Sequence, residues 1–247
     1  MRETPRDDPF FIGWLPVPRA YRVYQWGISI FAVQIALGSA LLIAGRQNSP
    51  GSASWDSSPQ SVEGVVYALP YPMLRTHGEP VRTILLVSDG KFGAAALVQP
   101  FDGQAVRVTG TMLRRDGWQM MELAEGDDAI QPIAVNDELR AVHRGEPKDL
   151  GEVSLAGEIV DAKCYLGAMK PGAGKTHKGC AVLCLRGGVP PIFVTGQRMF
   201  LLAGPGGGPA PESIIPFVGD PIRVMGRIQQ LDDLLILRLN ARDVRRR

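Results

Sequence analysis

Few features of the sequence favour a catalytic or a nucleic-acid-binding protein. Aromatic residues make up only 7% of the 247 residues, and the formal net charge is only +2. Nucleic-acid-binding surfaces need basic clusters and stacking aromatic side chains, so that class of protein is disfavoured. The catalytic motifs G-x-S-x-G and H-E-x-x-H do not occur in the sequence. We therefore expect a protein that is not an enzyme.

A phosphate-binding loop is also lacking, although "KPGAGKTHKGCAVLC", from Lys170 to Cys184, contains "GAGKT". The pattern G-x-x-x-x-G-K-[ST] requires a glycine at the position of Met169. Such loops join a strand to a helix in a parallel sheet, and the rest of the chain gives no sign of that alternation. No nucleotide is therefore expected as a cofactor.

Charged residues are absent from the 23 residues between Arg22 and Arg46. An apolar segment of this length can cross a bilayer with some tilt. The apolar core of a cleaved signal peptide is shorter, about 7–15 residues. The segment therefore predicts a retained transmembrane anchor over 23–45.

Positive charge is distributed unevenly about this anchor. The N-terminal flank carries four arginines, Arg2, Arg6, Arg19 and Arg22. After Arg46, the next basic residue is Arg75. Because positive flanks favour the cytoplasm, we expect segment 1–22 at the cytoplasmic face of a bacterial inner membrane. The remaining domains would then lie in the periplasm, an oxidising compartment for cysteine.

Four residues of the anchor recur at steps of seven, four and seven: Gly27, Gln34, Gly38 and Gly45. These steps place them near one face of a helix. Small residues allow close approach of a second membrane helix, and a glutamine within the membrane seeks a polar partner. The face therefore predicts contact with an integral membrane protein complex.

An internal repeat follows the anchor. "FDGQAVRVTGTMLRRDGWQMMEL" from Phe101 matches "FVGDPIRVMGRIQQLDDLLILRL" from Phe217 at Phe, Gly, Arg-Val, Gly and Asp. The 29 glycines and 20 prolines favour short strands and turns. Each copy has room for about five strands, which is the size of an OB-type barrel. We therefore predict a mainly β protein with one N-terminal transmembrane helix and two tandem OB-type barrels.

The predicted boundaries follow from this repeat. They are a linker at 46–61, a first barrel at 62–142, a connection at 143–153 and a second barrel at 154–247. The second copy is longer, because it contains the loop "GPGGGPAPES" and an insert that includes Cys164 and the stretch up to Cys184.

The insert carries the candidate site. Thr176 can cap the start of a helix, and Gly187-Gly188 can end it. On this helix His177, Cys180 and Cys184 would share one face. Cys164, at the end of the preceding strand, would meet them.

Three interpretations of this cluster remain open. Three cysteines and a histidine suit zinc or copper, or a haem-type ligation. Cys164 paired with Cys180 or Cys184 would instead be a structural disulfide. The third interpretation is a redox-active or partner-linking thiol, because nearby cations lower the pKa of a cysteine. These cations are Lys163, Lys175, Lys178 and Arg186.

"GEIVDAKCYLG…HKGCAVLCLRGG" resembles small exported bacterial OB-like domains with the pattern G-x-V-V-D-x-x-C followed by C-A-x-x-C-x-x-G. The matching residues are Gly157, Val160, Asp161, Cys164, Cys180, Ala181, Cys184 and Gly187. The resemblance implies an OB-type barrel with a cysteine-bearing helix, and it implies no activity.

Two functions are consistent with these features. The first is a non-catalytic, membrane-anchored periplasmic accessory or assembly subunit of a larger membrane complex, such as a respiratory or redox complex. The alternative is a metal- or haem-binding redox carrier. In both, the insert would make the specific contact, and the first barrel would be a spacer.

Overall fold

The computed structural model describes residues 19–46, 53–142, 145–167, 169–196 and 198–247. The chain divides into two compact units, Met1–Ser49 and Pro50–Arg247. Most of the expected cytoplasmic segment 1–22 and part of the expected linker 46–61 lie outside the described residues.

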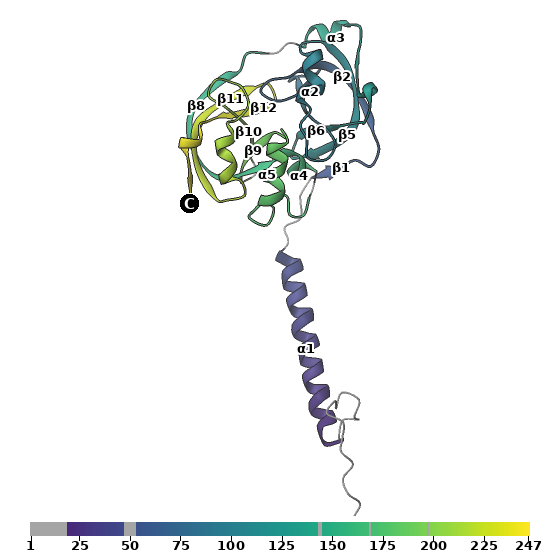
Figure 1. Cartoon of the computed structure of the whole chain (residues 1–247), viewed down its shortest axis with the longest axis vertical. Coiled ribbons are helices and arrows are strands. Elements are labelled where there is room, and N and C mark those ends of the chain that lie inside the picture. Colours follow the sequence, from purple (N-terminus) through teal and green to yellow (C-terminus); the bar gives the residue numbers. More distant parts are fainter. Residues whose placement is uncertain (1–18, 47–52, 143–144, 168, 197) are drawn as a thin grey trace, which may run out of the picture. The chain divides into compact units, whose positions relative to one another are not determined.

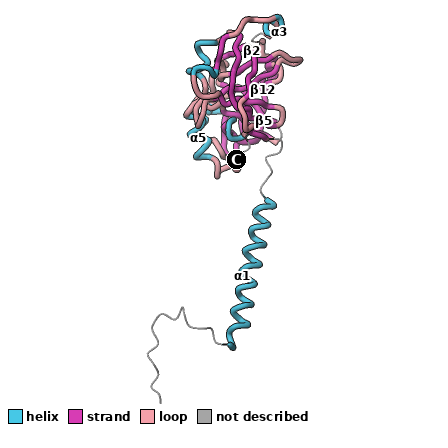
Figure 2. The backbone as a smooth tube through the Cα atoms, turned by 90° about the vertical axis from the view of Figure 1, so that its right-hand side faces the viewer, coloured by secondary structure: helices cyan, strands magenta, loops and turns pink. Residues whose placement is uncertain are grey.

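The first unit contains the apolar helix α1 (Arg19–Arg46), which Figure 2 shows as one unbroken helix. Within it, Tyr21–Gly45 is a candidate membrane span of 25 residues. By length and composition this helix fits either a single membrane span or a signal sequence. An N-terminal apolar helix is thus confirmed, whereas its membrane and its orientation stay predictions.

The face of α1 that is predicted to pack against a partner helix has free space at its three glycines in the described chain. A methyl group added at Gly27, Gly38 or Gly45 would meet no atom within 4 Å. Gln34 is exposed on the same side of the helix. Contact with a partner helix at this face stays a prediction.

The first barrel is a closed sheet of five strands (Figure 1). They are β2 (Gln60–Tyr67), β3 (Met73–Thr76), β4 (Arg82–Val87), β5 (Ala105–Arg115) and β6 (Trp118–Leu123). The order is β5–β2–β3–β4–β6, and β6 returns to β5. The β4–β6 pair is parallel, and the other pairs are antiparallel. The short strands β1 (Ser54–Trp55) and β7 (Ile130–Pro132) also pair with β5.

The second barrel repeats this arrangement. Its strands are β8 (Lys148–Asp161), β9 (Pro191–Thr195), β10 (Arg198–Ala203), β11 (Ile222–Leu231) and β12 (Leu234–Arg238). The order is β12–β10–β9–β8–β11, with β12 returning to β11 and β10 parallel to β12. A short strand, β13 (Val244–Arg246), pairs antiparallel with β11. A mainly β fold with two closed barrels of five strands is therefore confirmed.

Short helices lie in the connections. The first barrel has α2 (Ala95–Val98), η1 (Gln99–Phe101), η2 (Asp127–Ala129) and α3 (Asp137–Arg140). The second has α4 (Ala162–Leu166), α5 (Lys178–Arg186), η3 (Glu212–Phe217) and η4 (Ala241–Asp243). Both α4 and α5 lie between the first two strands of their barrel, whereas the matching connection 68–72 has no helix.

The repeat is visible in the backbone. Asp116 and Asp232, which match in the sequence repeat, have positive φ angles of 48° and 50°. A methyl group added at Gly110 would lie 2.1 Å from the Glu122 carbonyl oxygen, and one at Gly226 would lie 2.6 Å from that of Arg238. Both glycines therefore allow β5 and β11 to approach the next strand closely.

Two predicted boundaries differ from the structure. Strand β8 begins at Lys148, within the expected connection 143–153, and β1 and the start of β2 lie in the expected linker 46–61. The start of β8 contains charged residues and a glycine, which are typical of a loop. It is a strand because it pairs with β11 as far as Lys148, opposite Gln230.

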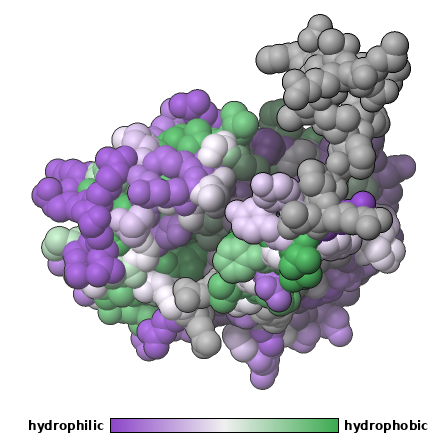
Figure 3. Space-filling view, turned by 90° about the horizontal axis from the view of Figure 1, so that it is seen from below, coloured by the Kyte–Doolittle hydropathy of each residue, from purple (hydrophilic) through white to green (hydrophobic). Residues whose placement is uncertain are grey.

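The two barrels share a hydrophobic core besides their own. It joins Met73 and Leu85 of the first barrel to Leu201 and Ile236 of the second, with α4 among them. Thr83 donates from its backbone N–H and its hydroxyl to Asp233, at 3.0 and 2.7 Å. Outside the cores, hydrophilic and hydrophobic residues are interspersed on the face drawn in Figure 3.

Backbone also meets backbone across this interface. The Gly93 N–H donates to the Gly187 carbonyl at 2.8 Å. A methyl group added at Gly187 would lie 1.9 Å from the Lys91 carbonyl oxygen. Only a residue without a side chain fits between α5 and the first barrel at this point.

We predict that Gly187→Ala lowers the free energy of unfolding by about 1–3 kcal/mol, because the new methyl group forces the barrels apart. Gly179→Ala is the matched control, since it lies in α5 with no atom within 4 Å of the added methyl group. The control should stabilise by about 0.5–1 kcal/mol, because alanine favours a helix. Urea unfolding of the full chain measures both, and equal midpoints would contradict the interface described here.

Candidate metal and thiol site

Cys164 is positioned by the end of β8. Asp161, the last residue of that strand, accepts a hydrogen bond from the Cys164 N–H through Oδ1 at 2.8 Å. An aspartate in this position caps a helix and starts it. The side chain of Asp161 is fully buried, so it holds α4 rigidly against the barrel.

His177, rather than Thr176, precedes the first residue of α5. The helix begins at Lys178, and no side-chain hydrogen bond caps it. The expected cap by Thr176 is therefore wrong. The buried His177 ring points to the carboxylate of Asp161, with Nε2 2.9 Å from Oδ2. The expected end of the helix is confirmed, because Gly187 is its C-cap and donates to the Leu183 carbonyl.

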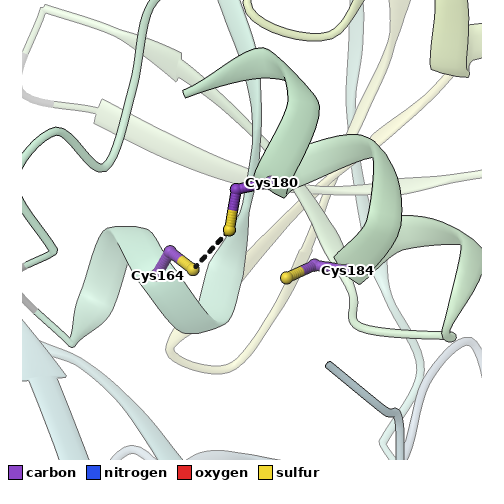
Figure 4. A group of neighbouring side chains, drawn as sticks. All are labelled: Cys164, Cys180 and Cys184. Atoms are coloured by element: carbon purple, nitrogen blue, oxygen red, sulfur yellow. Dashed lines mark hydrogen bonds between the residues drawn. The ribbon is translucent and has the colours of Figure 1, made fainter. Parts of the chain in front are cut away.

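Three sulfur atoms converge between α4 and α5. Figure 4 shows Cys164 on α4 and Cys180 and Cys184 on α5, with their side chains turned toward one another. The three Sγ atoms all lie within 4.8 Å of one another, and those of Cys164 and Cys180 are 4.0 Å apart. Cys164 and Cys184 are buried, whereas Cys180 is half-buried. All three are free thiols, so the structure contains no disulfide.

His177 belongs to a second group. Its ring lies within 4.8 Å of Asp161 and Cys164, and these three residues are all buried. The four predicted ligands are therefore brought together, but as two groups that share Cys164. The three sulfurs form one group, and His177 contacts the carboxylate of Asp161 in the other.

Lys91, in the connection after β4, is a member of the site that sequence reasoning missed. Its Nζ atom lies 2.8 Å from the Cys180 sulfur and 4.0 Å from the Cys184 sulfur. Nothing in its local sequence indicates this role, because the contact spans the two barrels. The first barrel, expected to be a spacer, thus contributes a cation to the thiol cluster.

The electrostatics of the cluster favour a thiolate at Cys184. A hydrogen bond from Cys164 is the main cause that lowers the pKa of Cys184, and the charge of Lys91 also lowers it. The pKa of Cys164 is strongly raised, because it donates to Cys184, is buried and lies near Asp161. The pKa of Lys91 is raised, chiefly by its hydrogen bond to Cys180.

Lys163, expected beside the cysteines, points into the first barrel instead. Its Nζ donates to the carbonyls of Ser88 and Gly90 at 2.9 and 2.7 Å and forms an ion pair with Glu122. Its side chain is only 4% exposed. This residue therefore joins α4 to the first barrel.

Comparison of the chain with protein-family models, with curated proteins and with solved structures finds no significant match.

We predict that Lys91→Met moves the ultraviolet thiolate titration of the cluster to higher pH, because a positive charge that lowers the pKa of Cys184 is lost. Lys175→Met, at an exposed lysine before α5, is the control and should leave the titration unchanged. Identical titrations for Lys91→Met and the unaltered protein would show that Lys91 does not act on the thiols.

Proposed function

We propose that this chain is a membrane-anchored accessory protein that holds one soft metal ion, copper(I), on Cys164, Cys180 and Cys184. The observation that carries the proposal is the mutual approach of the three sulfurs within 4.8 Å. Thiolates are the protein ligands that soft ions such as copper(I) prefer.

The sulfur spacing fits such an ion. Metal–sulfur bonds in protein thiolate sites are about 2.3 Å long. Three sulfurs about 2.3 Å from a common centre lie roughly 4 Å apart when they surround it evenly. The Cys164–Cys180 distance of 4.0 Å agrees with that spacing. Little rearrangement is therefore needed to bind the ion.

The ligand count favours copper(I) over zinc. Structural zinc sites are almost always four-coordinate. The sulfur group has three members, and His177 is held by Asp161. Zinc would need the ring of His177 or a water molecule as a fourth ligand, whereas copper(I) accepts three thiolates. A haem-type ligation stays a prediction for which the cluster gives no further support.

The surroundings of the cluster suit an anionic metal centre. Three thiolates around a monovalent cation leave excess negative charge, which the ammonium group of Lys91 offsets at 2.8 Å from Cys180. Asp161 caps α4 and also contacts His177, so it orients both helices that carry the sulfurs. Supporting contacts of this kind fix ligands in place.

The fold and the helix support the accessory part of the proposal. The closure of five strands in each barrel, with a parallel pair of third and fifth strands, supports an OB-type barrel. We therefore infer two OB-type barrels, the second with α4 and α5 as an insert. Such barrels are binding scaffolds, and α1 would hold them at a bacterial inner membrane, on the periplasmic side, beside a larger complex.

We predict that the full chain binds about one copper(I) ion in competition with a copper(I) chelator. Replacing Cys164, Cys180 or Cys184 by alanine should weaken binding at least tenfold, because each replacement removes one ligand. Met225→Leu removes an exposed thioether outside the cluster and should bind as the unaltered protein does. Zinc bound in preference to copper(I) would contradict the choice of metal.

Binding of the ion should become tighter as pH rises. The raised pKa of Cys164 means that its thiol is protonated in the free protein, and the ion must displace that proton. Titrations in buffers of different ionisation enthalpy measure the protons released. Binding without proton release would contradict a thiolate ligand at Cys164.

A second candidate function is a reversible disulfide between Cys164 and Cys180. The 4.0 Å distance between their Sγ atoms favours it. Its formation would remove two electrons and two protons, which an exchanging disulfide of another protein would accept. A thiol count of the denatured chain, isolated without reductant, distinguishes the two. One thiol indicates the disulfide, and three thiols support the metal site.

We predict that Gly38→Leu in α1 reduces co-purification of a membrane partner, because the larger side chain prevents close helix approach. Leu37→Ile, the control at a neighbouring exposed position, should retain the partner. A single monomeric species from the unaltered chain in detergent would contradict the accessory role while leaving the metal site untouched.

A further inference from the structure

A cavity of about 310 Å³ lies where the two barrels meet. This volume is at the lower end of the range for small-molecule sites. Strand β3 of the first barrel contributes Met73 and Arg75, and the second barrel contributes Leu231, Ile236 and Arg238. None of the three cysteines lines this cavity, so it is separate from the thiol cluster.

Arg75 lines this cavity and has buried donors that lack a partner among the described residues. Its side chain is completely buried, and its Nη2 group forms an ion pair with Asp232. The buried Nε and Nη1 atoms have no hydrogen-bond partner among the described residues. A guanidinium keeps its charge in proteins, and buried N–H groups nearly always have an acceptor. These two atoms are too deeply buried for a ligand to touch, so Arg75 acts on the cavity through its charge.

A second guanidinium lines the same cavity. The Nε atom of Arg238 on β12 is also buried and without a partner in the described part of the chain. Gly207, with φ of +84°, makes room for it, because a methyl group there would lie 3.0 Å from Arg238 Nη2. Among the described residues that line the cavity or form an ion pair with its arginines, Arg75, Arg238 and Asp232 leave a net positive charge, which suits one monoanion.

The rest of the lining is largely apolar. Leu69, Pro70, Met73, Ala203, Leu231 and Ile236 form much of the wall. An inorganic anion would leave this apolar surface in contact with water. A ligand with one charged end and an apolar body would satisfy both parts of the lining.

We propose that this cavity binds a small organic monocarboxylate, whose carboxylate accepts from Arg238 beside the charge of Arg75 and whose apolar part lies against Met73, Leu231 and Ile236. Guanidinium groups are well suited to carboxylates, because their N–H groups match both oxygens. The site requires both barrels, since β3 supplies one arginine and β12 the other. It depends neither on the metal nor on the membrane anchor.

The test uses the full chain in detergent, with benzoate as the probe and benzamide as its neutral analogue, measured by isothermal titration calorimetry. We expect one benzoate per chain and binding of benzamide at least about tenfold weaker, because benzamide lacks the charge. Arg238→Gln should weaken benzoate binding by a similar factor. Arg242→Gln is the control, because Arg242 is 82% exposed on η4, and it should not change the affinity.

Arg238 is the residue to replace, because loss of Arg75 would leave Asp232 without its ion-pair partner at the interface. Equal benzoate affinity of Arg238→Gln and the unaltered chain would overturn the proposal. Failure of both benzoate and hexanoate to bind at millimolar concentration would also overturn it. Inorganic phosphate bound as tightly as benzoate would overturn the organic part of the assignment.

Discussion

The structure of the second unit, Pro50–Arg247, depends on the buried side-chain amine of Lys163. Lys163 reaches from α4 into the first barrel, where the carbonyls of Ser88 and Gly90 and the carboxylate of Glu122 surround its Nζ atom. A buried charge without partners is strongly destabilising, so this contact fixes α4 against the first barrel. Because Cys164 is the next residue, the same contact fixes the first sulfur of the cluster. The geometry of the thiol site is therefore set by the association of the barrels.

This dependence explains why the duplicated fold carries sites that one barrel alone would lack. The thiols come from the second barrel, but the cation beside them, Lys91, comes from the first. The cavity likewise takes Arg75 from β3 and Arg238 from β12. Function on such scaffolds resides in connections placed on a rigid frame, and here the frame is the pair of barrels.

The sequence predicted the local elements well and the contacts between them poorly. The matched Asp116 and Asp232 were part of the repeat seen in the sequence, and both residues have positive φ angles of 48° and 50°. The placement of Cys180 and Cys184 on one face of a helix was predicted, because spacing along a helix is a local property. The contact of Lys91 with the thiols and the turn of Lys163 into the first barrel were not predicted. Each contact depends on residues of the other barrel. His177 was assigned to the sulfurs, since its spacing could not reveal the carboxylate of Asp161 beside its ring.

We infer that three sulfurs of this chain hold one soft metal ion. X-ray absorption at the copper edge, on the full chain loaded with one equivalent of copper(I), tests it most directly. We predict a coordination shell of three sulfur atoms, at about the 2.3 Å typical of thiolate sites, without nitrogen ligands. A shell containing imidazole nitrogen, or fewer than three sulfurs, would contradict it.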